Sequence, residues 1–369
     1  MTKSSTAIID YIGSKGGHHY YSLCLLDALE KKGVKTFYFS NVRVSQQSET
    51  TCFPVFHKEI KKDFWGFYNL FSGVIQSLRI SKKERVNTQI YHVFEASLIN
   101  CIVLGLIKAF GFDSIVIIHD IHSFDFKEKE ILRRIQYNWL SDFLIVHNNL
   151  SKQTFLNSFK RLRKPIQVIP HGGHQSIINI IERQEACKAL NLDVNKQHFL
   201  FFGQIKKMKG LDLLLKAWPS NELSELTIAG KPWRDNFEPY QEIIDNRGIQ
   251  DQVHLNISYI SDKERDLYYS AADFVILPYR EIFQSGVLLM AMSYGKAIIA
   301  SDLPANKEII EHDKNGLLFK TDNVSSLRNV IKRAHNLDST KLGLMAKETI
   351  NQYFDWTKIS EKYISLIKE

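Results

Sequence analysis

The 369-residue sequence contains few cysteines and no long apolar run. Cys24, Cys52, Cys101 and Cys187 stand singly in apolar surroundings, and no C-x-x-C motif occurs. This spacing argues against a zinc site or a disulfide framework and favours a reduced, cytoplasmic protein with buried thiols. No apolar run reaches the ~20 residues that a membrane-spanning helix needs. The first residues lead almost at once into a strand-like run, so we expect no signal peptide.

Internal repeats and low-complexity tracts are also absent, and the glycine spacing never gives the G-x-G-x-x-G dinucleotide fingerprint. The composition, 44% hydrophobic and 24% charged residues, is that of a globular protein. The length suits two ordinary α/β domains better than one.

Positive charge is concentrated in the first half. The first 170 residues hold 23 Lys and Arg against 14 Asp and Glu, a net charge of +9, and the remainder carries −1. An anionic partner there would be a membrane surface or a phosphate-bearing substrate. Ordinary solvated Lys and Arg on helix faces are the alternative. We expect no nucleic-acid partner, because no RNA- or DNA-binding module is recognisable.

Apolar runs and amphipathic stretches alternate through the first half, which indicates a parallel sheet covered on both faces. The predicted strands are 6–12, 36–40, 89–94, 114–118, 143–146 and 166–169. The predicted helices are 18–32, 63–78, 96–110, 128–140 and 151–161. We expect residues 41–62 to be irregular, and a long loop inside a compact domain is usually functional or mobile.

Two features of this half are candidate ligand contacts. Gly16 and Gly17 lie in a strand-to-helix turn, where glycine allows close approach of a ligand, although a tight structural turn explains them equally well. His119-Asp120 and His147-Asn148 follow apolar strands, at the carboxyl ends where open α/β sheets bind ligands. A structural role remains the alternative for each histidine.

The predicted helix 63–78 is rich in aromatic residues and is flanked by Lys and Arg. Its aromatic residues are Phe64, Trp65, Phe67, Tyr68 and Phe71. Aromatic side chains with flanking basic residues suit a helix lying in a membrane interface. A core-packed helix with solvated ends is the alternative.

A second alternation begins after the glycine-rich segment 170–174. Its predicted strands are 199–203, 226–230, 253–255, 274–278 and 297–300. We therefore expect an N-terminal domain over 1–175, a C-terminal domain over 176–352, and a final helix within 353–369 that packs back on the N-terminal domain.

Two turns of this second half favour a bound phosphate. Lys206, Lys207 and Lys209 lie between a strand end and a helix start, where ammonium groups repel the helix dipole unless an anion lies between them. Three solvated lysines are the alternative. Residues 274–300 read as a strand, a turn, a helix opened by Gly286, and a strand. The free N–H groups at such a helix start favour a phosphate or carboxylate, and a purely structural crossover is the alternative.

In combination these motifs resemble glycosyltransferase family 4, whose members have the GT-B fold of two doubly wound Rossmann-like domains facing across a cleft. The resemblance is carried by F-F-G-Q-I-K-K-M-K-G at 201–210, P-Y-R-E-I-F-Q-S-G-V-L-L-M-A-M-S-Y-G-K at 278–296, I-I-A-S-D at 298–302 and N-G-L-L-F at 315–319. It implies transfer of a sugar from a nucleotide-sugar with retention of anomeric configuration.

Carried over residue by residue, the resemblance implies a donor site with these parts. Lys209 would hold the donor diphosphate, Ser285, Gly286 and Val287 would meet it through backbone N–H groups, and Gly16 and Gly17 would line the cleft opposite. His119 would face the transferred sugar, and Tyr259 lies where the family contacts the base.

Two positions depart from the family pattern. Gln204 stands where the family has an arginine. Of the two glutamates that the family places eight positions apart, Met290 replaces the second, which normally holds the ribose, and Ile282 is in register for the first. Glu281, one residue early, could serve as the first after a shift in the turn, so we take His119 and Glu281 as the candidate catalytic residues.

The resemblance also implies the partners. We expect a UDP- or GDP-sugar donor, a saccharide or polyprenyl-diphosphate-linked acceptor in surface polysaccharide synthesis, and no cofactor. No Asp-x-Asp motif is present and the fold usually needs no metal ion, so we expect none. The basic first half predicts attachment to the anionic inner face of the plasma membrane. A catalytically silent paralogue acting as a binding or scaffold subunit is the alternative.

Overall fold

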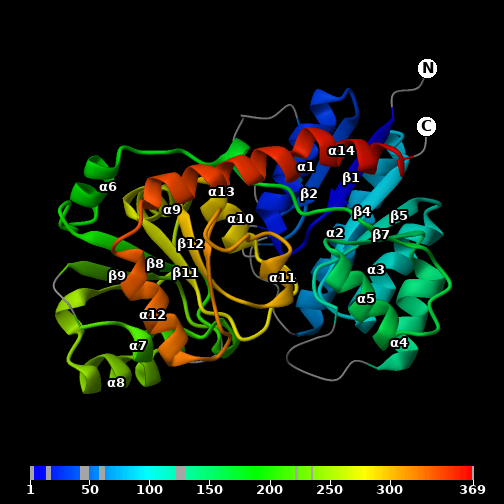
Figure 1. Ribbon diagram of the computed structural model, residues 1–369. Helices are drawn as coiled ribbons and strands as arrows, with labels where there is room; N and C mark the ends of the chain where they lie inside the picture. The colour runs from blue at the N-terminus through cyan, green and yellow to red at the C-terminus, as the bar shows by residue number, and fades with distance from the viewer. Residues whose placement is uncertain are drawn as a thin grey trace. The chain divides into compact units, whose positions relative to one another are not determined.

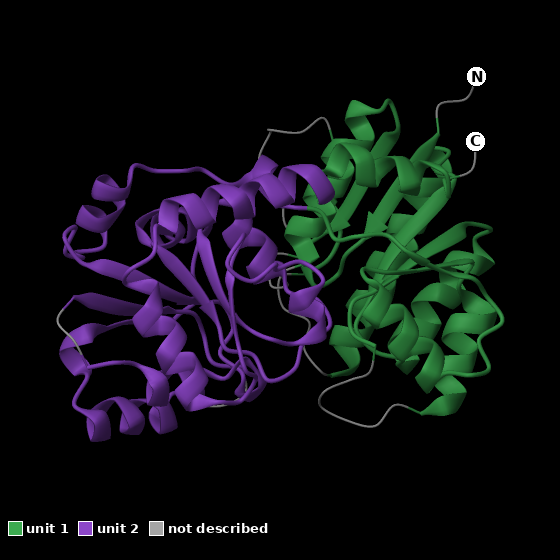
Figure 2. Ribbon diagram, in the orientation of Figure 1, with its two compact units in different colours: residues 1–172, 354–369 green, residues 173–353 purple. Residues whose placement is uncertain are grey.

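The computed structural model describes residues 4–13, 18–41, 50–57, 63–121, 129–220, 223–233 and 236–367. The chain forms two compact units, shown in Figure 2. Unit 1 comprises residues 1–172 and 354–369, and unit 2 comprises residues 173–353. Both units contain a parallel sheet covered by helices on both faces (Figure 1).

Unit 1 is built on a seven-stranded parallel sheet in the order β3-β2-β1-β4-β5-β6-β7. The strands are β1 (Ser5–Ile9), β2 (Lys35–Ser40), β3 (Thr51–Pro54), β4 (Thr88–Val93), β5 (Asp113–Ile118), β6 (Phe143–Val146) and β7 (Ile166–Val168). The helices are α1 (His18–Lys31), α2 (Phe64–Lys83), α3 (Leu98–Ala109), α4 (Glu130–Arg134), the π-helix η2 (Ile135–Leu140), α5 (Asn149–Ser158) and α14 (Trp356–Ile364). The inner strands are almost wholly buried, because helices cover both faces of a parallel sheet.

Two expectations for this unit were wrong in detail. The segment expected to be irregular contains β3, an edge strand paired with β2 from Phe37↔Thr51 to Ser40↔Pro54. Partly exposed edge strands lack a long apolar run, and the proline that ends this one is tolerated at an edge. The first strand ends at Ile9 rather than Ile12, because the chain turns at Asp10.

The final helix, α14, belongs to unit 1 and packs against α1. The ring of Trp356 meets that of Tyr21 edge-on with centroids 4.9 Å apart, and the hydroxyls of Tyr21 and Tyr363 hydrogen-bond to each other. Lys32 Nζ pairs with Glu361 at 2.6 Å on the surface. Aromatic burial thus fixes this helix, since an exposed ion pair adds little.

Unit 2 contains a six-stranded parallel sheet in the order β10-β9-β8-β11-β12-β13. The strands are β8 (Gln197–Phe202), β9 (Ser224–Ala229), β10 (Val253–Asn256), β11 (Phe274–Leu277), β12 (Ala297–Ser301) and β13 (Leu317–Phe319). The α-helices are α6 (Arg183–Ala189), α7 (Leu211–Ala217), α8 (Glu238–Arg247), α9 (Asp262–Ala271), α10 (Gly286–Ser293), α11 (Pro304–Lys307), α12 (Val324–Ala334) and α13 (Ser339–Tyr353). Short 3₁₀ turns are η3 (Gln175–Ile177), η4 (Lys207–Lys209) and η5 (Gln250–Gln252).

One face of this second sheet carries the main core of the unit. Phe199, Leu226, Phe274 and Ile299 from neighbouring strands pack with residues of α7, α8 and α12, which include the fully buried Trp218 at the end of α7. Helices α6, α9, α10 and α13 lie on the opposite face (Figure 1). The strands are therefore held rigidly, and the turns at their carboxyl ends are the parts available for binding.

Candidate donor-binding site

The order of strands in unit 2 marks a specific crevice. The chain runs outward from β8 to β10, crosses back, and then runs outward from β11 to β13, so β8 and β11 are neighbours at the point where the direction reverses. Open α/β sheets bind ligands at the carboxyl ends of the strands at such a switch point. Lys209 follows β8, and Ser285, Gly286 and Val287 follow β11. The sheet topology thus places these predicted residues on both sides of one crevice.

The three lysines after β8 have different surroundings. Lys207 is exposed, whereas the ammonium group of Lys206 lies 4.9 Å from the ring centroid of Trp233 in a cation–π contact. Lys209 is half-buried, with Nζ 5.4 Å from the ring centroid of Tyr279. The picture of three solvated lysines therefore fits only Lys207.

The ammonium group of Lys209 lies beside Gly203 and near the start of α10. A methyl group built on Gly203, the first residue after β8, would lie 3.3 Å from Lys209 Nζ and 3.5 Å from Val287 Cγ2. Gly203 therefore leaves space that the lysine and the start of α10 border together. Among the described residues no carboxylate lies within ion-pair distance of Lys209 Nζ. Burial, together with repulsion from Lys206, lowers the pKa of Lys209 to about 8.

Arg280 fastens the lysine loop to the end of β11. Its guanidinium forms two bonds with the Asp212 carboxylate, at 2.7 and 2.9 Å, and a third with Asp322 at 2.8 Å. It also donates to the Lys207 carbonyl at 3.0 Å, and its own N–H donates to the Met208 carbonyl at 2.7 Å. Because the Arg280 guanidinium bonds to both the lysine loop and α7, it restricts Lys209 to a narrow range of positions.

The start of α10 has the features of an anion site. The hydroxyl of Ser285 caps the helix by accepting from the Leu288 N–H at 3.1 Å. The first N–H groups of a helix, here those of Gly286 and Val287, have no acceptor within the helix. A methyl group built on Gly286 would meet nothing within 4 Å, so the chain beside its Cα is not packed against other atoms. An oxyanion in that space would gain backbone donors and a favourable helix dipole.

The remaining predicted residues of unit 2 lie at the margins of this crevice. Gln204, Glu281 and Tyr259 are all exposed; Glu281 precedes the Ser285 cap, and Tyr259 follows β10. Met290 is buried within α10. The side chain in the position where the family normally has its ribose-binding glutamate therefore contributes to the core instead.

Sequence reasoning missed two supporting residues of this crevice. Tyr279 is fully buried beneath Lys209. His174 is also buried; its N–H donates to Ser293 Oγ at 2.9 Å, so the segment that enters unit 2 is bound to the end of α10. Both residues lie within segments that the sequence analysis had marked, but only the folded contacts show which way their side chains face.

In unit 1, histidines occupy the carboxyl ends of four neighbouring strands. His92 lies at the end of β4, His119 follows β5, His147 follows β6, and His171 lies three residues beyond β7. A fifth, His18, begins α1. The sequence had marked only His119 and His147 as strand-end residues. His92 lies within an apolar strand run and His171 three residues after one, and this proximity to strand ends was the signal that could have found them.

The predicted turn between β1 and α1 is anchored by Asp10. The buried carboxylate accepts from Gly13 N–H at 2.7 Å, His18 Nε2 at 2.8 Å and the Tyr38 hydroxyl at 2.6 Å. Burial alone would raise the pKa of Asp10, but His18 and these hydrogen bonds hold it well below its usual range. Gly16 and Gly17 themselves lie outside the described residues.

His119 lies within an aromatic and imidazole environment. Its ring stacks on Phe94 at a centroid distance of 4.8 Å, and its Nε2 lies 2.8 Å from His92 Nδ1. Burial, followed by repulsion from His92 and His147, lowers the pKa of His119 well below its usual value. A neutral imidazole, not an imidazolium, therefore stands at the end of β5.

Two searches of the described residues bear on cofactors and membranes. No group of three or more His, Cys, Asp or Glu side chains in the described part of the chain has the geometry to hold a metal ion, the histidines of unit 1 included. No described helix has the length and apolarity needed to cross a bilayer.

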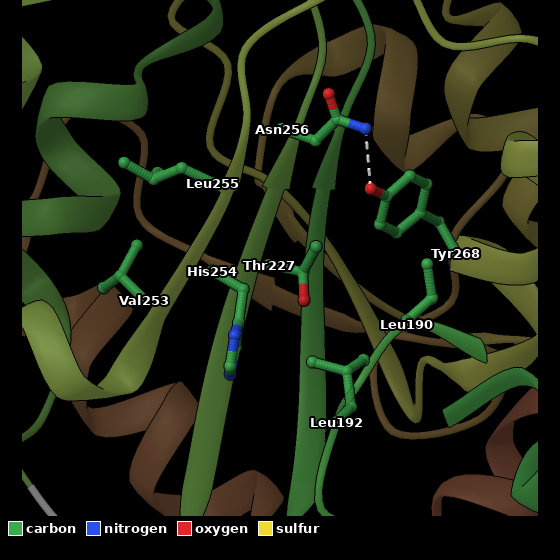
Figure 3. Close-up of a pocket in the computed structure, with 8 residues that line it drawn as sticks. All are labelled: Leu190, Leu192, Thr227, Val253, His254, Leu255, Asn256 and Tyr268. Carbon is green, nitrogen blue, oxygen red and sulfur yellow. Dashed lines mark hydrogen bonds between the residues drawn. The ribbon is translucent and has the colours of Figure 1, made fainter. Parts of the chain in front are cut away.

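A separate pocket lies at the outer edge of the second sheet, away from the switch point. It has a volume of about 340 Å³ and is bordered by Thr227, His254, Asn256 and Tyr268, with Asn256 Nδ2 donating to the Tyr268 hydroxyl at 2.8 Å (Figure 3). None of the predicted site residues borders it.

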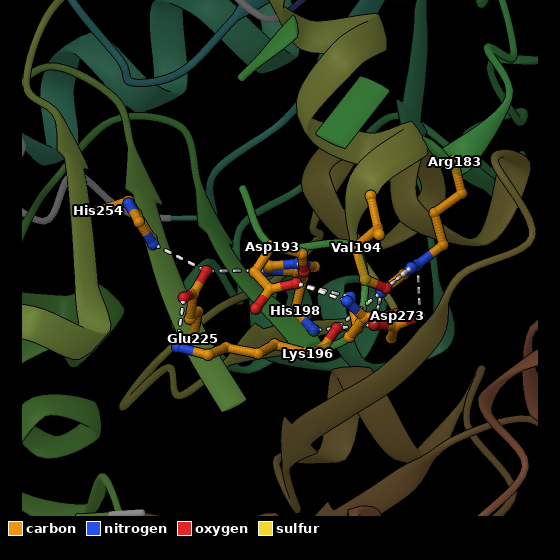
Figure 4. Close-up of polar contacts among 9 residues, drawn as sticks. Arg183, Asp193, Val194, Lys196, His198, Glu225, His254 and Asp273 are labelled. Carbon is orange, nitrogen blue, oxygen red and sulfur yellow. Dashed lines mark hydrogen bonds and ion pairs between the residues drawn. The ribbon is translucent and has the colours of Figure 1, made fainter. Parts of the chain in front are cut away.

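A polar network beside this pocket links the first strands of unit 2. Glu225 accepts from Lys196 and His254, each at 2.9 Å (Figure 4). Arg183 pairs with Asp273 at 2.9 Å in the same network. These bonds satisfy partly buried charges at the sheet edge, which is a structural role.

Solved structures show the same fold over nearly the whole chain. Sucrose-phosphate synthase from Thermosynechococcus elongatus superposes with a TM-score of 0.77 at 19% identity, covering 99% of this chain and 98% of its own. The complex of Anabaena HepE with UDP-glucose superposes with a TM-score of 0.75 at 17% identity, covering 98% and 99%. Identity this low shows the fold alone, which is the GT-B fold of two Rossmann-like units.

Sequence similarity to a family is found in unit 2. The model of the family described as "Glycosyl transferases group 1" matches residues 182–349. The "Uncharacterized glycosyltransferase MJ1069" of Methanocaldococcus jannaschii is 24% identical over 60% of this chain and 57% of its own. The "GDP-mannose:cellobiosyl-diphosphopolyprenol alpha-mannosyltransferase" of Xanthomonas oryzae pv. oryzae is 28% identical over 45% of each. The chain spans about half the length of the curated relatives that it matches.

Proposed function

We propose that this protein is a glycosyltransferase that moves a sugar from a nucleotide-sugar donor to a saccharide acceptor. One observation carries the proposal. Lys209 and the start of α10 border the switch-point crevice of a domain that matches the model of the group 1 glycosyltransferases. An unpaired ammonium group and free backbone N–H groups suit a diphosphate, and they also suit the charge that develops on it as it leaves.

The finer parts of the proposal rest on resemblance. Retention of configuration follows the resemblance to glycosyltransferase family 4, and a polyprenyl-diphosphate-linked acceptor agrees with the acceptor named for the Xanthomonas relative. We propose a UDP- or GDP-sugar as donor and no metal ion, because Lys209 and the start of α10 can meet the charge on the leaving group. Surface polysaccharide synthesis is the proposed setting.

A thermal-shift panel tests donor binding directly. A ligand present at 100 times its Kd stabilises the native state by about 2.7 kcal/mol, which raises the melting temperature of the domain that binds it. We expect UDP, GDP or their sugar conjugates to raise it in the presence of EDTA, and uridine or guanosine alone to have no effect. Failure of every nucleoside diphosphate and nucleotide-sugar to stabilise the protein would refute the proposed function.

One observation favours a second candidate, a catalytically silent paralogue that binds a partner transferase. Met290 is buried where the family normally has the glutamate that holds the ribose. The two candidates differ in turnover. An enzyme hydrolyses or transfers its bound nucleotide-sugar when lipid-linked acceptor is supplied, whereas a silent paralogue binds a nucleotide or none and gives no product.

We further propose that unit 1 meets an anionic membrane surface through the first turns of α2. Phe64, Trp65, Phe67 and Tyr68 are exposed there by 77, 68, 41 and 58%. The alternative of a core-packed helix therefore does not hold for these four side chains. The basic residues at the other end of α2 lie up to ~30 Å along the helix, too far to flank the aromatic group. Aromatic side chains of this kind favour the headgroup region of a bilayer.

Vesicle binding measures this contact. We expect the chain to sediment with vesicles of phosphatidylglycerol more than with phosphatidylcholine. The paired change Phe64→Ala with Trp65→Ala should weaken binding by roughly a hundredfold or more, because each of the two rings contributes about 1.5–3 kcal/mol when buried. Leu344→Ala in unit 2, at a side chain 57% exposed, is the matched control and should have no effect. Equal vesicle binding by the paired variant and the control would exclude the α2 surface.

A further inference from the structure

A chain of three hydrogen-bonded side chains ends at His119. Ser22 Oγ, on α1, lies 3.1 Å from His92 Nε2, and His92 Nδ1 lies 2.8 Å from His119 Nε2. Ser22 Oγ also lies 3.1 Å from the His18 carbonyl, one helical turn earlier. Ser22 is completely buried and His92 nearly so. Each of these hydrogen bonds contains one proton. The direction in which the successive hydrogen bonds are donated therefore decides which nitrogen of His119 is protonated.

The direction follows from counting bonds. If Ser22 donates to the His18 carbonyl, which can only accept, its oxygen is free to accept from His92 Nε2–H, and Ser22 makes two hydrogen bonds. If Ser22 donates to His92 instead, it makes one, and the His18 carbonyl loses a donor. A buried hydroxyl that satisfies both of its roles is the more stable arrangement.

The protonation of His119 follows from this direction. A neutral His92 protonated on Nε2 has a lone pair on Nδ1, which accepts from His119 Nε2–H. His119 Nδ1 then carries a lone pair, and it has no hydrogen-bond partner among the described residues. The reverse direction would instead place an N–H donor at Nδ1.

Burial and the neighbouring groups keep these imidazole rings neutral. Burial and repulsion from His18 lower the pKa of His92 to about 3. His147, with its ring centroid 5.1 Å from that of His119, donates Nδ1–H to the Ile169 carbonyl at 3.0 Å, and its pKa is lowered by burial to about 4. No member of the group is driven to take a second proton, so the direction of the hydrogen bonds alone sets the tautomer.

We propose that Ser22 and His92 are positioning residues that hold His119 in its Nε2–H tautomer, so that Nδ1 accepts a hydrogen bond from a hydroxyl group of the transferred sugar. The role rests on the proposed function, but the tautomer does not. An acceptor nitrogen favours a neutral sugar with a free hydroxyl and disfavours a carboxylate at that point, since two lone pairs repel. Phe94 holds the ring plane, stacked on it at 14°.

Imidazole ¹⁵N chemical shifts of the full chain test the tautomer without any ligand. We expect the signals lost in His119→Gln to be those of a neutral ring protonated on Nε2, and Ser22→Ala to introduce the Nδ1–H form. Ser77→Ala is the matched control, because Ser77 is equally buried and bonds to the carbonyl four residues back on its helix, at 2.8 Å. A His119 ring protonated on Nδ1 in the unmodified chain would overturn the proposal.

Kinetics separate positioning from general destabilisation. With UDP-glucose or GDP-mannose as substrate, Ser22→Ala should lower kcat about three- to tenfold, the value of one neutral hydrogen bond, with little change in KM. Ser22→Thr should restore the rate, and Ser77→Ala should leave it unchanged. An unaltered kcat in Ser22→Ala would exclude a positioning role. Absence of turnover in the unmodified chain would count against both the proposed function and the positioning role. The tautomer of His119 would still be tested by the ¹⁵N chemical shifts.

Discussion

Replacement of Lys209 by alanine should abolish most donor binding and nearly all transfer. The ammonium group lies at the switch point with no carboxylate partner among the described residues, so a diphosphate would be its counterion. A charge-assisted hydrogen bond contributes about 1.5–3 kcal/mol, which predicts a roughly tenfold to hundredfold rise in the Kd for UDP or GDP. Because charge also grows on the leaving group, kcat should fall further, by about 10²-fold or more. Titration calorimetry and product formation measure the two effects.

Lys207→Ala provides the control. That side chain is exposed and belongs to the same loop, and only its backbone carbonyl is used, as an acceptor for Arg280. Binding by Lys207→Ala should stay within about twofold of the unmodified protein, since surface charge contributes little. Equal losses in the two variants would show that the loop acts through its overall charge and that Lys209 has no specific role.

The pKa of Lys209 adds a pH dependence with a definite sign. In the free protein this pKa is about 8, and a bound diphosphate would raise it by stabilising the ammonium form. Affinity should therefore be constant below pH 8 and fall up to tenfold per pH unit above it. The free energy of unfolding of the free protein should instead rise between pH 8 and 10.5, because in this range the unfolded chain holds the Lys209 proton more tightly than the folded chain does. Lys209→Arg should remove the pH dependence of binding.

The strands were predictable wherever burial on both faces leaves a continuous apolar run. Phe274–Leu277 is wholly buried, and its sequence FVIL is recognisable without any structure. The edge strand β3 was not predictable, because Pro54 interrupts the short apolar run 52–56 and because Thr51 and Pro54 are exposed. The exposure of Trp65 could not be predicted either, since the same aromatic composition would suit a core helix.

The candidate site was predictable by position but not by orientation. The sequence placed Lys206, Lys207 and Lys209 together after a strand, yet only folding turns Lys209 toward Gly203 and stacks Lys206 on Trp233. The contacts among the histidines of unit 1 depend on the register of the strands. His92 belongs to β4 and His119 follows β5, and the pairing of these two strands brings the histidines into hydrogen-bond contact. Such contacts between distant residues cannot be read from local sequence patterns.

Gly210→Ala should strongly destabilise the donor side of unit 2. Gly210 has φ +68° and ends the lysine loop, and an added methyl group would lie 2.0 Å from the Pro278 carbonyl oxygen. The left-handed backbone costs alanine roughly 1–2 kcal/mol, and overpacking adds about 1–3 kcal/mol. We expect a loss of about 3 kcal/mol, which lowers the melting temperature by roughly 10 °C for a unit of this size.

Gly248→Ala separates the two causes, because Gly248 has φ +60° at the end of α8 and nothing within 4 Å of the added methyl group. It should lose only the backbone part, about 1–2 kcal/mol, and should bind donor normally. Gly210→Ala should bind donor poorly even at temperatures where it is fully folded, because relief of the clash with Pro278 moves Lys209 away from the start of α10. If the two variants had equal stability and equal affinity, the close contact between the lysine loop and the end of β11 would not be what positions Lys209.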